Sequence, residues 1–196
     1  MHKSSTLTAW VDESMHDFSP SLGAGFYVLA ATVVAREHHG LVRERMLGLV
    51  KGRASRLHWR DESSSRRAVI AETIAGLPVE HVVAIGSPLN LHRQERARRL
   101  CLEWALSHLD GQGVAEVFVE TRQEQLDRRD IKLLDAARSK RWVSSALRMD
   151  FLSPQSEPLL WAADAVAGAV GAALTGRDPV PRNALGASVT EICRDL

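Results

Sequence analysis

The pattern of apolar and polar residues first predicts two strands separated by a loop. The run TLTAWVD at 6–12 and the run GFYVLAATVVA at 25–35 are rich in β-branched and aromatic residues, which favour strands. The segment between them, 13–24, contains Ser, Pro and Gly, which is the composition of a hairpin loop. We therefore expect the chain to open with two adjacent strands.

Strands and helices then alternate along the chain. Pro158 near a first turn and Gly176 after the last apolar residue are typical limits of a helix, with Ser156 as its N-cap. Prolines and a glycine in 179–196 indicate a loosely held tail after one domain at 1–178. We expect a short extended segment at 55–59, strands at 80–85, 115–120 and 142–152, and helices at 37–52, 61–75, 90–109, 123–138 and 156–175. This order predicts an α/β fold, a mixed central sheet with helices on both faces.

Composition narrows the class of protein. The 196 residues are 45% hydrophobic and 25% charged, as in a globular domain. Lys and Arg total 25 against 24 Asp and Glu, which argues against a polycation that coats nucleic acid. A nearly neutral chain can still carry a local basic stripe. Cys101 and Cys193 are too far apart for a cysteine zinc motif. The N-terminus lacks the apolar core of a signal peptide, and Asp164 interrupts the most apolar stretch, so we expect a cytoplasmic protein without a membrane span.

Three carboxylates stand out by their positions. Asp12 and Glu120 each lie at the C-terminal end of a predicted strand, the edge where sites gather in open α/β sheets. Asp164 lies in an otherwise apolar helix, where an ionised group is costly unless it is paired, exposed or bound to metal. Carboxylate oxygens suit Mg²⁺ or Mn²⁺, which can activate water for phosphodiester cleavage.

Each of these residues also has an ordinary explanation. Asp12 is equally a turn or cap residue, Glu120 a partner in a surface ion pair, and Asp164 an acid on a solvent-facing side of its helix. His58, between Leu57 and Trp59, is either a proton shuttle near metals or a packed histidine. Arginine groups on the helices predicted at 90–109 and 123–138 either bind phosphates or lie on solvated faces.

Several short motifs, in order, resemble a known family. The residues DES at 12–14, the strand at 26–34, LHW at 57–59 and the closing SPQSEPLLWAADAVAG at 153–168 resemble the DUF3800-type family, whose last helix carries an Ala-Asp-x-x-Ala-Gly core. The resemblance covers nearly the whole chain, from Asp12 to Gly168. It implies a ribonuclease H-like fold and a metal-dependent nuclease site.

The resemblance also assigns residues. It implies that Asp12, Glu120 and Asp164 bind the metal, and that Glu13 and His58 occupy catalytic motif positions. A further acid could come from Asp61 or Glu62, at the start of the second helix. The chain departs from the family where Met15 replaces a common Gly, Trp161 a common Gln, and Glu120 a common Asp. These departures leave the acids intact and affect substrate fit.

These observations predict a divalent-metal-dependent nuclease that hydrolyses phosphodiester bonds in DNA or RNA with Mg²⁺ or Mn²⁺. A catalytically weak or inactive ribonuclease H-like module that binds nucleic acid or protein is the alternative, and a component that cuts only with a partner protein is a third. A homo-oligomer is also open. The chain has no G-x-S-x-G elbow and no glycine-rich phosphate loop, so acyl transfer and nucleotide-driven chemistry have no support.

Overall fold

A six-stranded mixed sheet forms the centre of the protein, which a computed structural model describes for residues 6–52 and 54–196. The strands run in the spatial order β5-β4-β1-β2-β3-β6. The antiparallel hairpin of β1 and β2 lies in the middle, β4 and β5 add to β1 in parallel, and β3 adds to β2 antiparallel with β6 parallel to β3. The strands are β1 Leu7–Ser19, β2 Ala24–Ala35, β3 Val79–Ser87, β4 Val114–Glu120, β5 Arg148–Leu152 and β6 Val189–Asp195.

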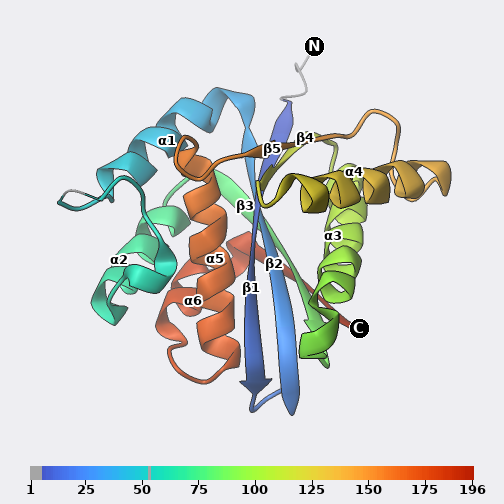
Figure 1. The fold of residues 1–196 in the computed structure, drawn as a ribbon. Helices are drawn as coiled ribbons and strands as arrows, with labels where there is room; N and C mark the ends of the chain where they lie inside the picture. Colours follow the sequence, from blue (N-terminus) through green and yellow to red (C-terminus); the bar gives the residue numbers. More distant parts are fainter. Residues whose placement is uncertain (1–5, 53) are drawn as a thin grey trace.

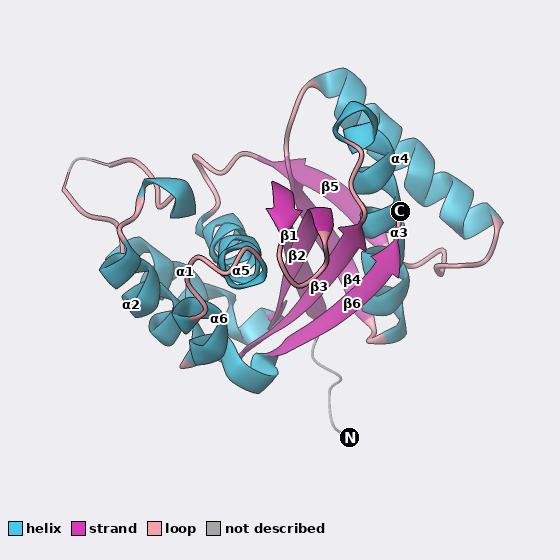
Figure 2. Cartoon of the chain, turned by 90° about the horizontal axis from the view of Figure 1, so that it is seen from below, coloured by secondary structure: helices cyan, strands magenta, loops and turns pink. Residues whose placement is uncertain are grey.

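Helices cover both faces of this sheet (Figures 1 and 2). On one face, α5 (Pro158–Leu174) packs on β1 and β2, with α1 (His39–Gly48), α2 (Ser64–Ala75) and α6 (Val180–Leu185) around it. On the other face lie α3 (Gln94–Gly111) and α4 (Glu124–Ser139). Short 3-10 turns occur at Arg36–His38, Trp59–Asp61, Leu91–Arg93 and Gly186–Ser188. The predicted mixed sheet with helices on both faces is confirmed.

The alternation of side chains along β1 and β2 explains the two layers. Successive residues of a strand point to opposite faces. Trp10 and Val28 accordingly join the core under α5, whereas Val11 and Leu29 join the core under α3. Because both faces are covered, β2 is apolar almost throughout and buried from Gly25 to Val34.

Two sequence expectations about the ends of elements are wrong. The segment 13–24 is not a long loop, because β1 continues to Ser19 and the turn is confined to 20–23, where Gly23 has a φ of +66°. The N-cap of α5 is Glu157 and not Ser156; its carboxylate accepts the Leu159 N–H at 3.0 Å and pairs with Arg43 at 2.7 Å. The carboxylate of Glu157 therefore caps the helix in place of the Ser156 hydroxyl that the sequence predicted.

The prediction that residues 179–196 form a loosely held tail is also wrong. These residues form α6, a 3-10 turn and β6, and β6 pairs with β3 from His81 with Val189 to Ser87 with Asp195. Val189 and Leu185 are buried in the core on the α5 side of the sheet. The strand expected at 142–152 is likewise shorter, since β5 begins at Arg148. Within the described parts of the chain, no helix is both long and apolar enough to cross a bilayer.

Candidate active site

The register of two parallel strands brings Asp12 and Glu120 side by side. Trp10 pairs with Phe118 and Val11 with Val119, so Asp12 and Glu120 occupy the next positions of β1 and β4. Their side chains are joined by a hydrogen bond. Contrary to expectation, Asp12 is not at the end of its strand; it lies where β4 stops and β1 continues, paired only with β2. Beyond the two carboxyls, β1 therefore has only β2 as a hydrogen-bonded neighbour.

Helix α5 supplies the third acid and holds a loop against it. Asp164 accepts a hydrogen bond from the backbone N–H of Trp59 at 2.8 Å and from Nδ1 of His58 at 3.0 Å. One turn later, Gly168 lies so close to the indole of Trp59 that a Cβ would collide with it. The segment that carries His58 is therefore fixed on the face of α5 that carries Asp164.

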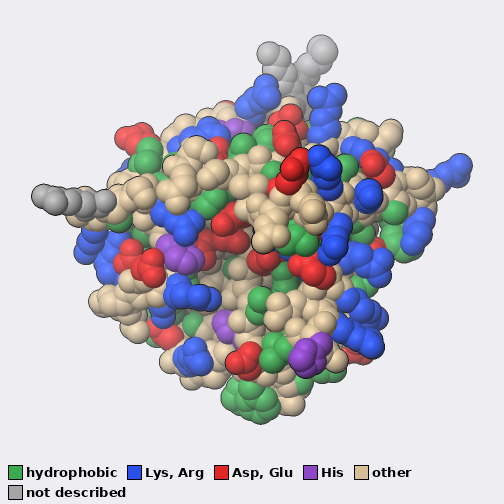
Figure 3. All heavy atoms as spheres, in the orientation of Figure 1, with side chains coloured by type: hydrophobic (Ala, Val, Ile, Leu, Met, Phe, Trp, Pro, Cys, Tyr) green, Lys and Arg blue, Asp and Glu red, His purple; other side chains and the backbone are tan. Residues whose placement is uncertain are grey.

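The three acids share one small cleft. It has a volume of about 100 Å³ and is lined by Asp12, Glu13, Arg56, Leu57, His58, Glu120, Pro154, Leu160, Trp161 and Asp164. Figure 3 shows acidic side chains gathered in a hollow of this face, with basic and histidine side chains around it. Residues more than 100 positions apart thus meet at one point.

The electrostatics of the cleft show that the carboxyls act on one another. The pKa of Asp12 is raised well above its usual value, first by burial and then by the charges of Asp164 and Glu120, while Arg98 opposes the shift. Burial also raises the pKa of Glu120, and the positive charge of Arg56 opposes this rise. The hydrogen bond to Asp164 raises the pKa of His58, and burial opposes it. The cleft therefore concentrates negative charge that lacks full compensation from the protein.

Glu13 is not brought into this group. Its side chain points to the opposite face of the sheet from Asp12, as alternation requires, and forms an ion pair with Arg98. Arg98 also pairs with Asp130 at 2.8 Å, and Arg122 reaches the same carboxylate at 3.2 Å. Glu13 thus contributes to the wall of the cleft while its carboxylate belongs to a buried ionic network under α3 and α4.

The other two acids considered from sequence lie outside the cleft. Glu62 forms an ion pair with Arg66 at 3.1 Å, and Asp61 is exposed on the 3-10 turn. The charge of Asp61 favours the protonated form of His58, but neither Asp61 nor Glu62 lines the cleft.

Sequence reasoning missed Arg56. It lines the cleft, opposes the rise in the pKa of Glu120 and disfavours the protonated form of His58. It lies in the loop between α1 and the 3-10 turn, where no periodicity gives a side chain a direction. Only its place two residues before His58 in the LHW segment hinted at a role.

The donor set fits a hard cation by its chemistry. Asp12, Glu120 and Asp164 offer carboxylate oxygens, the ligands that Mg²⁺ and Mn²⁺ prefer, and a cation would relieve their mutual repulsion. In residues 6–52 and 54–196, however, no group of three His, Cys, Asp or Glu side chains already stands close enough together to hold a metal ion. Binding would thus require the acid side chains to adjust their rotamers.

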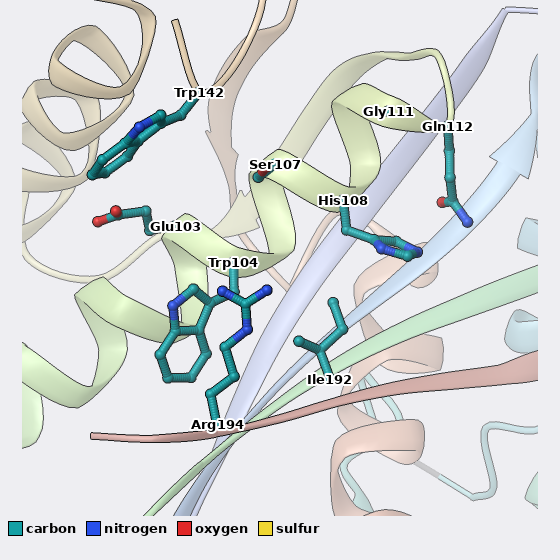
Figure 4. Close-up of a pocket in the computed structure, with 9 residues that line it drawn as sticks. All are labelled: Glu103, Trp104, Ser107, His108, Gly111, Gln112, Trp142, Ile192 and Arg194. Atoms are coloured by element: carbon teal, nitrogen blue, oxygen red, sulfur yellow. The ribbon is translucent and has the colours of Figure 1, made fainter. Parts of the chain in front are cut away.

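A larger groove elsewhere lacks such chemistry. It has a volume of about 750 Å³ and lies between α3, Trp142 and the edge strand β6 (Figure 4). The guanidinium of Arg194 lies over the ring of Trp104, 5.6 Å from its centroid, and Glu103 is the single carboxylate in the lining. The small acidic cleft is therefore the better candidate for an active site.

The sheet order and the cleft define a class, the ribonuclease H-like fold with acids at the centre of one sheet face. The chain is similar to the solved structure of the PCNA:RNase HII complex from Archaeoglobus fulgidus, with a TM-score of 0.55 and 18% identity, over 91% of this chain and 86% of that one. It is also similar to ribonuclease H2 from Pyrococcus horikoshii, with a TM-score of 0.54 and 11% identity, over 91% and 75%. No family model and no curated protein matches the chain. At these identities the likeness establishes the fold.

Proposed function

We propose that this protein is a divalent-metal-dependent nuclease that hydrolyses phosphodiester bonds in DNA or RNA. One observation carries the proposal: Asp12, Glu120 and Asp164, from two strands and a helix, line one cleft and act electrostatically on one another. The ribonuclease H-like fold supports it, since the solved structures with this fold include ribonucleases HII. The resemblance to the DUF3800-type family, which implies the same activity, stays a hypothesis.

In this proposal, Asp12, Glu120 and Asp164 hold Mg²⁺ or Mn²⁺. When bound, the metal supplies activation of water and stabilisation of the leaving oxygen. The protein's own contribution is to gather the carboxylates on one sheet face and to orient them. His58 and the Trp59 N–H fix the same oxygen of Asp164, which directs the other oxygen of that carboxylate toward the cleft.

Arg56 gives the cleft a positive side. Its positive charge acts against the rise in the pKa of Glu120, and a guanidinium can form paired hydrogen bonds with a phosphate. A substrate phosphate between Arg56 and the acids would bring the scissile bond to the metal. Nucleic acid is the proposed partner.

Cleavage assays test the proposal. Wild type should cleave single- or double-stranded DNA or RNA with Mg²⁺ or Mn²⁺ and not with EDTA. Asp12→Asn and Asp164→Asn should each lower the rate by at least about 100-fold, since each removes a ligand of the metal. The matched control is Asp135→Asn, which makes the same carboxylate-to-amide change at an exposed acid of α4. It should retain the wild-type rate. Undiminished cleavage by Asp12→Asn and Asp164→Asn would refute the assignment.

The alternative function is a module that binds nucleic acid or protein without useful catalysis. It is favoured by one observation, that the acids in the described chain are not yet arranged as a metal site. Salt-sensitive binding of oligonucleotides, without metal-dependent cleavage of any of the four substrates, would support this alternative.

A further inference from the structure

Polar side chains continue along β1 past Asp12 on the same face of the sheet. Ser14 and His16 alternate with Asp12 and so point toward α5. The Ser14 hydroxyl and Nε2 of His16 lie 2.7 Å apart and are hydrogen-bonded. The His16 ring stacks on Phe26, with centroids 4.7 Å apart and planes 15° apart. The pair is therefore held in place rather than free on the surface.

Helix α5 makes room for this pair. Asp164, Gly168 and Gly171 are spaced by four and three residues and lie on one side of the helix. Gly171 lies against the His16 ring as Gly168 lies against Trp59, and a Cβ at either position would collide. The helix side that presents Asp164 to the acids thus continues as a glycine-lined wall beside Ser14 and His16. Asp12, Ser14 and His16 therefore follow one another along the face of β1 that packs on α5, and we call this row of side chains the track.

Two arginines flank the far part of that track. Arg60 follows Trp59, and Arg177 lies three residues after the end of α5. Both disfavour the charged form of His16, whose pKa is lowered first by burial and then by Arg177, with Asp17 acting in the opposite direction. Across residues 6–52 and 54–196, neither guanidinium has a side-chain hydrogen bond or an ion pair, whereas nearby Arg67 is bonded to the Trp59 carbonyl.

We propose that Ser14, His16, Arg60 and Arg177 form a second subsite, which binds the backbone phosphodiester next to the one cleaved at the acids. This inference rests on the proposed function, since it assumes a nucleic-acid substrate. Guanidinium groups chelate phosphate oxygens, and a hydroxyl donates to them. Residues on one face of a strand are about 7 Å apart, so Ser14 lies one such step from Asp12. The substrate strand then runs along β1 toward the hairpin turn.

The test measures binding separately from cleavage. A fluorescent single-stranded oligonucleotide, as DNA and as RNA, is titrated with protein in EDTA at several salt concentrations. The Arg60→Gln, Arg177→Gln double variant should bind at least about fivefold more weakly at low salt. Its slope of log K against log salt should be shallower by about 0.7, as for one lost phosphate contact on a single strand. Ser14→Ala should weaken binding without changing the slope.

The matched control is the Arg96→Gln, Arg129→Gln double variant. It makes the same change of charge at exposed arginines on α3 and α4, across the sheet from the cleft. It should keep the wild-type affinity and slope. An equal loss in both double variants would overturn the subsite, because it would show a general effect of charge.

Parallel cleavage assays separate the two proposals. If wild type cleaves with Mg²⁺ or Mn²⁺ but the Arg60→Gln, Arg177→Gln variant binds like wild type, the subsite is wrong and the nuclease proposal stands. If no cleavage occurs but the variant loses its salt-dependent contact, the subsite stands and the nuclease proposal fails.

Discussion

Asp164 accepts a hydrogen bond from Nδ1 of His58 at 3.0 Å, and since a carboxylate has no proton to donate, the imidazole proton must lie on Nδ1. In the neutral ring this leaves Nε2 as a proton acceptor. The same bond is the main cause of the raised pKa of His58. His58 is thereby a positioning residue for Asp164, fixed in tautomer and orientation.

The first prediction concerns this positioning role. His58→Ala should weaken Mn²⁺ binding by about 10- to 100-fold, as is typical when a group that orients a metal ligand is lost. Isothermal titration calorimetry with Mn²⁺ measures it. His92→Ala, at an exposed histidine on another 3-10 turn, is the control and should bind as wild type does. Equal affinity in both variants would remove His58 from the site.

The second prediction concerns pH and the stability of the metal-free protein. Because the folded state raises the pKa of Asp12, its contribution to stability is fully present below its ordinary pKa of about 4 and is lost as pH rises through the raised pKa. Asp12→Asn should therefore be more stable than wild type at pH 7 in EDTA, by a Tm difference of about 2–4 °C. The difference should shrink as pH falls toward 4. Thermal melts across pH measure it, and a constant difference would contradict the raised pKa.

The third prediction uses the close contact of α5 with Trp59. Gly168→Ala should lower the free energy of unfolding by about 1–3 kcal/mol, because the added methyl must displace the indole. It should also weaken Mn²⁺ binding, since Trp59 and His58 are adjacent and both hold Asp164. Gly40→Ala in α1, where a Cβ meets open space, is the control and should be neutral or slightly stabilising. Urea titration gives both free energies.

The fourth prediction separates Glu13 from the acids of the cleft. Glu13→Gln should lower the free energy of unfolding by about 1–3 kcal/mol, because Arg98 is buried and loses one of its two charged partners. Its affinity for Mn²⁺ should stay within about threefold of wild type. A large loss of metal affinity with unchanged stability would instead place Glu13 among the ligands.

The sequence made the main acids visible for reasons that the structure explains. Asp164 interrupts a helix that is buried on nearly every side, so its charge needed a partner, and the structure supplies His58 and the Trp59 N–H. Glu120 ends a strand with a clear apolar pattern. The alternation rule also explains Glu13, because consecutive residues of an extended strand cannot face the same side. The predicted strand ended at Asp12, so the rule could be applied to Glu13 only once β1 was seen to continue to Ser19.

Other features depended on contacts that local patterns do not encode. Arg56 lies in an irregular loop beside the buried Leu57, where no regular alternation predicts which way a side chain points. Strand β6, with sequence VTEICRD, has an edge position and a mostly exposed pattern, so its pairing with β3 decides its structure. The Ser14–His16 pair became visible only when the expected loop proved to be a strand.

The bond between Asp164 and the Trp59 backbone joins residues 105 positions apart. Closing so large a loop costs chain entropy that many other native contacts must offset. The cluster of Asp12, Glu120 and Asp164 therefore forms only with the native topology, and no isolated hairpin or helix contains it. Under the proposed function, cation binding should consequently report complete folding, and it should be absent from separate fragments that carry β1 or α5 alone.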